Sequence, residues 1–72
     1  MMSVLYMMDG CPVCAQVLKH LNEHRIQYEK RNIIEEYDAR EKLKKLTGEV
    51  YVPVFVHDQG ILVGRNILRM KS

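Results

Sequence analysis

The chain has 72 residues, of which 47% are hydrophobic, and its formal net charge is +2. Such a chain can bury roughly 60% of its unfolded surface, enough for one thin core, so we expect residues 1–72 to form a single domain. The basic residues are scattered among acidic ones, so we expect no nucleic-acid partner, and no apolar run approaches the roughly 20 residues that a membrane span needs.

The first eight residues are mostly apolar, and we predict a buried strand over Ser3–Met7. The segment lacks the features of a secretory signal, because it has no basic start, its apolar part is too short and no small-residue cleavage site follows it. We therefore expect a cytoplasmic location. In a reducing compartment, closely spaced cysteines are more often catalytic or metal-binding than structural.

Cys11 and Cys14 are the two cysteines of the chain, and they lie between this strand and a predicted helix. The helix is expected to run from Pro12 to about His24, because proline suits a first helical turn and the apolar residues then follow a helical period. The apolar face of this helix consists of Cys14, Val17, Leu18 and Leu21.

A cysteine just before a helix meets unpaired backbone N–H groups and the positive end of the helix dipole, which favour the thiolate. We therefore predict that Cys11 is a nucleophile with a lowered pKa and that Cys14, one turn later, is the resolving cysteine. Asp9 would oppose the thiolate if it lay close to it. This layout is typical of a protein that exchanges thiols and disulfides.

A second strand and a second helix are predicted next. Ile26–Ile34 mixes isoleucine and tyrosine with charged residues, and a helix joins it to the first strand, so we expect the two strands to be parallel. Tyr37–Leu46 is predicted to be a surface helix that ends at Thr47-Gly48. Its apolar face consists of Ala39, Leu43 and Leu46.

The last third of the chain predicts a β-hairpin made of Val50–Val56, a turn at His57–Gly60 and Ile61–Val63. Asn66 is a candidate cap for a short final helix that reaches Met70. The resulting order, βαβαββ with a terminal helix, belongs to the α/β class. It predicts a four-stranded mixed sheet flanked by helices.

Four features occur in a fixed order along the chain: Tyr6, Gly10-Cys11-Pro12-Val13-Cys14, Val52-Pro53 and Gly64. In this combination the chain resembles the glutaredoxin-like branch of the thioredoxin superfamily. The resemblance implies a thioredoxin-like fold and a cis peptide bond before Pro53, which would pack beside the active-site sulfurs. It also implies that Val13, Val52, Pro53 and Gly64 contact the substrate.

The implied activity is that of a thiol–disulfide oxidoreductase, acting as a monomer with no tightly bound cofactor and no metal. Its substrates would be protein or mixed disulfides, and protein disulfides are favoured because an extended partner can pair with the Val52 backbone. No flavin or nicotinamide site is recognisable, so electrons must come from glutathione or from a thioredoxin-reductase-type flavoenzyme, as in the redoxins that serve ribonucleotide reductase.

The chain departs from the glutathione-binding pattern of the family. Those proteins usually carry a lysine shortly before the first cysteine, a tyrosine at the third motif position, and Gly-Gly followed closely by aspartate. Here the corresponding residues are Met8, Val13, Val63-Gly64 and Asn66-Ile67. Each lost charge-assisted contact would weaken binding by about 1.5–3 kcal/mol. Arg65 is a candidate to bind a carboxylate instead, with a solvated arginine at a strand end as the alternative.

Three alternative functions are considered. Cys11, Cys14, His20 and His24 superficially suggest zinc, but a continuous helix would place Cys14 and His24 about 15 Å apart. A shared iron–sulfur cluster would need the glutathione contacts that are missing. A non-enzymatic module that retains the fold would have no need of both cysteines.

Overall fold

The computed structural model describes residues 3–58 and 60–69. Its elements in chain order are β1 (Val4–Met7), α1 (Pro12–Glu23), β2 (Glu29–Asn32), α2 (Tyr37–Thr47), β3 (Val54–His57), β4 (Gly60–Val63) and the 3-10 helix η1 (Gly64–Arg69). The strands form one sheet in the order β2-β1-β3-β4, in which β1 is parallel to β2 and the other pairs are antiparallel. This is the predicted α/β architecture with a four-stranded mixed sheet.

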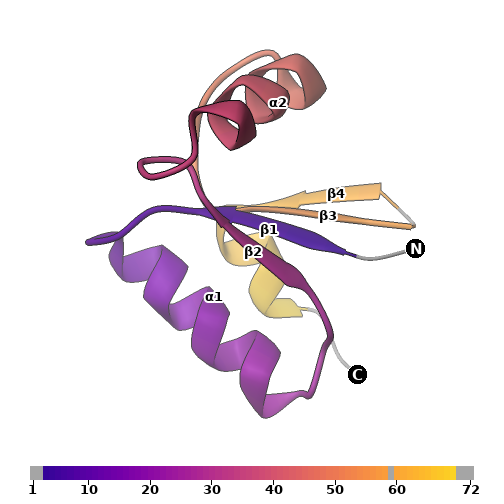
Figure 1. Cartoon of the computed structure of the whole chain (residues 1–72). Coiled ribbons are helices and arrows are strands. Elements are labelled where there is room, and N and C mark those ends of the chain that lie inside the picture. Colours follow the sequence, from indigo (N-terminus) through magenta and orange to yellow (C-terminus); the bar gives the residue numbers. More distant parts are fainter. Residues whose placement is uncertain (1–2, 59, 70–72) are drawn as a thin grey trace.

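Helices cover both faces of the sheet (Figure 1). α1 and η1 lie together on one face, and α2 lies on the other. Among the described residues, no helix has the length and apolar character that a membrane crossing requires.

The alternation of side chains along β1 divides the interior into two clusters. Leu5 and Met7 point into the cluster with α1 and η1, whereas Tyr6 belongs to the cluster with α2. The buried members of the α1 cluster are Leu5, Met7, Cys14, Val17, Leu21, Phe55 and Ile67. Those of the α2 cluster are Tyr6, Ile33, Ala39, Leu43 and Val54. Cys14 is therefore a core residue, which anchors the second sulfur in the protein interior.

α1 ends where it was predicted to end, but the segment after it is not yet a strand. Arg25 has a left-handed φ of 55°, and the N–H groups of Arg25 and Ile26 donate to the carbonyls of Asn22 and Leu21. This is the Schellman arrangement that closes a helix. Because these residues complete the helix end, β2 begins at Glu29 and not at Ile26.

β2 also ends earlier than predicted, because the side chain of Asn32 turns the chain. Asn32 is buried, and its Oδ1 accepts a hydrogen bond from the Ile34 N–H at 2.9 Å. Its carbonyl accepts from the N–H groups of Glu35 and Glu36 at 3.2 and 2.9 Å. These bonds replace strand pairing after Asn32, so Ile34 is carried out to the surface.

The hairpin is confirmed with shifted limits. β3 starts at Val54 and not at Val50, since Pro53 has no N–H to donate to a strand ladder. His57 and Gly60 pair with each other and therefore belong to the strands and not to the turn. Residue 59 lies outside the described residues.

The predicted final helix is present but differs in type and start. It is the 3-10 helix Gly64–Arg69, so Asn66 lies inside it and the prediction of Asn66 as its cap is wrong. Ile67 is fully buried in the α1 cluster, and this contact holds η1 against α1. Met70, the predicted end, lies outside the described residues.

α2 begins at Tyr37 as predicted and ends one residue later than predicted, with Gly48 in a left-handed conformation as its C-cap. Ala39 and Leu43 are buried, whereas Leu46 is 43% exposed although it lies on the same face of the helix. Leu46 points in a similar direction to Ala39 and Leu43 around the helix. Its exposure therefore results from its place in the last turn.

Leu43 and Leu46 form a matched pair for a stability test on one helix. We expect Leu43→Ala to lower the free energy of unfolding by about 2–5 kcal/mol, because Leu43 is 0% exposed and its loss leaves a cavity. Leu46→Ala should cost far less, since that side chain is 43% exposed. Urea denaturation followed by circular dichroism measures both. Equal losses for the two variants would contradict the two-cluster description of the core.

Candidate active site

Cys11 is the N-cap residue of α1, and its sulfur is part of the helix start. Its backbone is extended, with φ −92° and ψ 114°, and its Sγ accepts a hydrogen bond from the Cys14 N–H at 3.2 Å. Its carbonyl accepts from the Ala15 N–H at 3.0 Å. Both cysteines are thiols in this structure. The sulfur of Cys11 thus takes the place that a serine or aspartate oxygen occupies in ordinary N-caps.

The surroundings of Cys11 favour its thiolate. Burial raises the pKa of this thiol, but hydrogen bonds from the Cys14 side chain and from the backbone N–H groups of Cys14 and Val13 outweigh that effect. The net result is a pKa below the ordinary value. A lowered pKa increases the share of the nucleophilic form near neutral pH.

Cys14 has the opposite character. Burial, the hydrogen bond to Cys11 and the negative charge on Cys11 raise the pKa of the Cys14 thiol to about 11, although a hydrogen bond from the Met8 backbone acts against this. Cys14 is 1% exposed, whereas Cys11 is half-buried. The two sulfurs therefore differ in access and in the direction in which their pKa is shifted.

Asp9 does not act on the thiolate in the way that its sequence position suggests. Its Oδ2 accepts a hydrogen bond from the amide of Asn32 at 3.0 Å, and the same amide donates to Glu35 Oε1 at 2.9 Å. Asn32 thus ties the loop before Cys11 to the loop that follows β2. Sequence reasoning missed this residue, since a single asparagine among charged residues gives no signal of burial.

The segment around Pro53 lies against the same cluster as the dithiol. The Val52–Pro53 peptide bond is cis, as the resemblance predicts, and the Pro53 side chain is fully buried. Cys11, Val13 and Val52 all pack against the α1 cluster. The Pro53 carbonyl accepts from the Gly64 N–H at 2.9 Å, which brings the start of η1 to this segment.

The backbone of Val52 has no hydrogen-bond partner among the described residues. Val52 directly precedes β3, so it offers extended backbone groups at the end of a strand. An extended substrate segment can pair with such groups.

A groove of about 500 Å³ lies between the residues that follow β1 and β2, the start of α2 and the segment before β3. It is lined by Met8, Ile33, Ile34, Tyr37, Arg40, Val50, Tyr51 and Val52. We call it the Val52 groove. Apart from Val52 and Met8, its residues were not singled out from the sequence, because they come from three separate segments that only the fold brings together.

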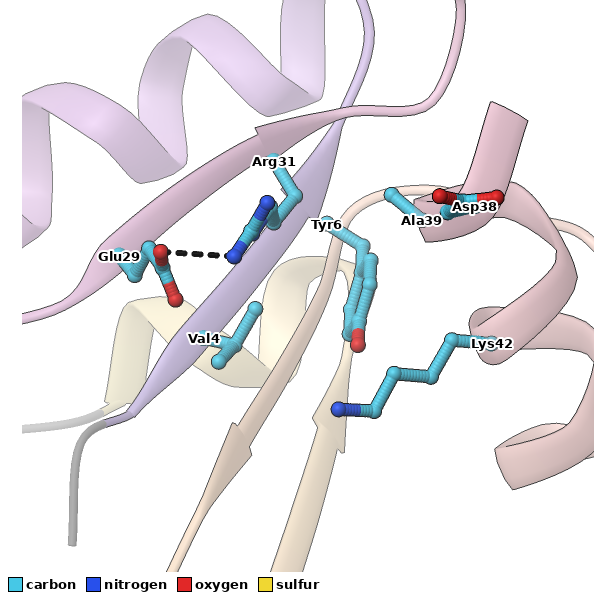
Figure 2. Close-up of a pocket in the computed structure, with 7 residues that line it drawn as sticks. All are labelled: Val4, Tyr6, Glu29, Arg31, Asp38, Ala39 and Lys42. Carbon is cyan, nitrogen blue, oxygen red and sulfur yellow. Dashed lines mark hydrogen bonds and ion pairs between the residues drawn. The ribbon is translucent and has the colours of Figure 1, made fainter. Parts of the chain in front are cut away.

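A second, smaller pocket of about 180 Å³ lies between the sheet and α2 (Figure 2). Its lining consists of Val4, Tyr6, Glu29, Arg31, Asp38, Ala39 and Lys42. The guanidinium of Arg31 forms ion pairs with Glu29 and Glu36, each with an N···O distance of 2.8 Å. Burial raises the pKa of Tyr6 here. No residue of the dithiol segment lines this pocket.

Two of the sequence-based candidates lie away from the groove. Arg65 is exposed at the start of η1 and is not among the residues that line the Val52 groove. His20 and His24 lie on α1 with their ring centroids 4.2 Å apart and their planes tilted by 51°. Within residues 3–58 and 60–69, no group of three or more His, Cys, Asp or Glu side chains is placed to hold a metal ion.

Comparison with known proteins places this geometry in a family. The sequence model of the glutaredoxin family matches residues 4–61, which is well over half of the chain. The chain belongs to the glutaredoxin family. It has the thiol-oxidoreductase kind of function that this family shares. No curated protein sequence matches it closely enough to count as a relative.

Solved structures of other glutaredoxins and thioredoxin-like proteins share the fold. A thioredoxin-like protein is 24% identical with a TM-score of 0.80, over 86% of this chain and 85% of its own. The glutaredoxin of Archaeoglobus fulgidus is 22% identical with a TM-score of 0.78, over 94% and 86%. That of Methanosarcina mazei is 20% identical with a TM-score of 0.74, over 96% and 79%.

The hydrogen bond between the two cysteine side chains can be tested in this glutaredoxin by two replacements at one position. Cys14→Ala removes the side-chain donor, whereas Cys14→Ser keeps a hydroxyl donor in its place. We expect the pKa of Cys11 to be higher in the alanine variant, because less of its thiolate charge is stabilised. Ultraviolet absorbance of the thiolate against pH measures it. Identical titration curves would remove the Cys14 side chain as a cause of the lowered pKa.

Proposed function

We propose that this glutaredoxin is a dithiol–disulfide oxidoreductase in which Cys11 attacks the substrate and Cys14 releases it. The observation that carries the proposal is the cap of α1, where the Cys14 N–H donates to the Cys11 sulfur at 3.2 Å. The pKa of Cys11 is lowered and that of Cys14 is raised, so the Cys11 sulfur is suited to attack the substrate and the Cys14 sulfur to react in the second step.

The cycle has two exchange steps. In the first, the Cys11 thiolate attacks one sulfur of the substrate disulfide, a Cys11–substrate disulfide forms, and the other substrate sulfur leaves as a thiolate. In the second, the Cys14 thiolate attacks the Cys11 sulfur, and the remaining substrate thiolate leaves. Two electrons pass from the dithiol to the substrate, and the protein ends with a Cys11–Cys14 disulfide.

The first step also activates the second. Once Cys11 is in a mixed disulfide it carries no negative charge, so two of the causes that raise the pKa of Cys14 are removed. The Met8 backbone hydrogen bond, which lowers the pKa of Cys14, remains available. Cys14 thus loses its proton more readily after the substrate is attached.

Val13, Val52, Pro53 and Gly64 are proposed to hold the substrate beside Cys11. Val13 and Val52 pack against the same cluster as Cys11, and Val52 offers its open backbone to an extended segment. Protein disulfides are therefore the preferred substrate class. The cycle needs a single chain and constant re-reduction, which suits a monomer in a reducing compartment such as the cytoplasm.

The reductant that restores the dithiol is proposed to be a thioredoxin-reductase-type flavoenzyme, with glutathione as the second candidate. The Val52 groove supports this choice, because Arg40 is the one cationic residue in its lining. Glutathione carries a carboxylate at each end, and one cation is poorly matched to two separated anions. Arg65, exposed and outside the groove lining, remains a candidate for the second carboxylate.

Two substitutions test the roles of the cysteines. We expect Cys11→Ser to abolish disulfide exchange, because it removes the attacking sulfur. Cys14→Ser should instead accumulate a substrate disulfide on Cys11, because the resolving sulfur is absent. Intact-protein mass spectrometry after mixing with a disulfide substrate distinguishes the two results. Equal failure of both folded variants to form the mixed disulfide would contradict the assignment of Cys11 as nucleophile.

The reductant is tested by following NADPH oxidation with the oxidised protein in two coupled systems. One contains glutathione with glutathione reductase, and the other contains a thioredoxin reductase. We expect turnover with the flavoenzyme to be the faster, because the groove lacks a second cation for glutathione. Turnover with glutathione alone would show that other residues bind the tripeptide, and glutathione would then be the reductant.

A further inference from the structure

We propose that the Val52 groove selects substrates by binding an extended polypeptide that has bulky apolar side chains beside its disulfide cysteine and an acidic side chain opposite Arg40. The inference rests on the proposed function, because the groove acts on a substrate that Cys11 attacks. It adds a substrate class, namely apolar and acidic polypeptide disulfides in preference to glutathione.

Large apolar side chains in the groove are exposed to solvent, which is energetically unfavourable in water. Ile34 is 69% exposed and Tyr37 is 67% exposed, and both line it together with the partly exposed Val50. Seven of its eight lining residues are aliphatic, aromatic or methionine. An apolar patch of this kind, concentrated at one place on a small protein, marks a binding surface.

The position of Ile34 is enforced by the fold. Its N–H donates to the buried Asn32 side chain at 2.9 Å, and this bond holds residue 34 in the turn after β2. The adjacent Ile33 is buried in the α2 cluster. Ile34 is thus held at the surface with its apolar side chain exposed to solvent, so a partner can cover it without any rearrangement of the core.

Two residues connect the groove to the dithiol segment. Val52 lines the groove and, like Cys11 and Val13, also packs against the α1 cluster. Met8 lines it as well, and the Met8 backbone forms a hydrogen bond with the Cys14 sulfur. A segment whose cysteine reaches Cys11 and whose backbone pairs with Val52 therefore places its next side chains in the groove.

The charge of the groove specifies an acidic group in the partner. Arg40 is exposed and forms no ion pair with a described residue. Two carboxylates near it in sequence have other partners, because Glu36 binds Arg31 at 2.8 Å and Glu41 accepts a hydrogen bond from the Tyr37 hydroxyl at 3.0 Å. A carboxylate from the partner can form a bidentate pair with the free guanidinium.

The test uses the Cys14→Ser protein and disulfides that share one leaving group, thionitrobenzoate. In each reaction the Cys11 thiolate attacks the peptide sulfur, a Cys11–peptide disulfide forms, and thionitrobenzoate leaves with the electron pair of the broken S–S bond. The exchange has no net oxidation, and the coloured product gives its rate. The probes are an apolar peptide with leucine and phenylalanine beside cysteine and one glutamate, its serine-substituted counterpart, and glutathione.

Each rate is divided by the rate with the symmetrical thionitrobenzoate disulfide. On this relative scale, we expect the apolar peptide to react about five- to tenfold faster than the serine-substituted peptide or glutathione. The double variant Ile34→Ser, Tyr37→Ser should lose most of this ratio. Ile61→Ser is the matched control, because Ile61 is a similarly exposed isoleucine, at 42%, that does not line the groove. Equal rates for the peptides and glutathione on the Cys14→Ser protein would overturn the proposal.

A charge exchange tests the role of Arg40. Arg40→Glu should slow the glutamate-containing peptide about fivefold and speed the matching lysine-containing peptide, whereas Lys19→Glu, on the helix of the opposite sheet face, should do neither. Identical effects of both variants would overturn the contribution of Arg40. Absence of product with every disulfide, from a protein of unchanged circular dichroism, would overturn the proposed function and this inference together. Reaction with all disulfides at equal rates would overturn this inference alone.

Discussion

The chemistry of this glutaredoxin depends on one hydrogen bond, from the Cys14 N–H to the Cys11 sulfur. The bond satisfies a backbone donor that α1 cannot satisfy by itself, and it stabilises negative charge on the atom that has to react. The Cys11 sulfur is thus both the N-terminal cap of α1 and the proposed nucleophile. Because this interaction favours the thiolate, it stabilises the reduced protein relative to the disulfide form, and it therefore raises the reduction potential of the dithiol.

Much of the fold could be predicted from local patterns. The helical period from Pro12 onward, the glycine that closes α2 and the β-branched residues of the hairpin each predict an element that the structure contains. The limits of β2 could not be predicted, since they depend on hydrogen bonds made outside the strand. Arg25 in a left-handed conformation delays β2, and the side chain of Asn32 ends it.

The dithiol could be predicted from its spacing, because two cysteines at the start of a helix have few other uses in a small domain. The Val52 groove could not be predicted from the sequence. Met8, Ile34, Arg40 and Val50 come from segments between which the sequence shows no relation, and the pairing of β1 with both β2 and β3 brings these segments together. Arg65 illustrates the converse, because it is near Gly64 in sequence and yet does not line the groove.

The side chain of Asn32 has a consequence for how this protein can be redesigned. Its amide donates to Asp9, in the loop before the dithiol, while its carbonyl oxygen accepts from Ile34, at the wall of the groove. The two loops therefore form one module. Transplanting the groove wall of another family member without its matching first loop would leave one N–H of a buried amide without its acceptor, so grafts of substrate preference have to exchange both loops at once.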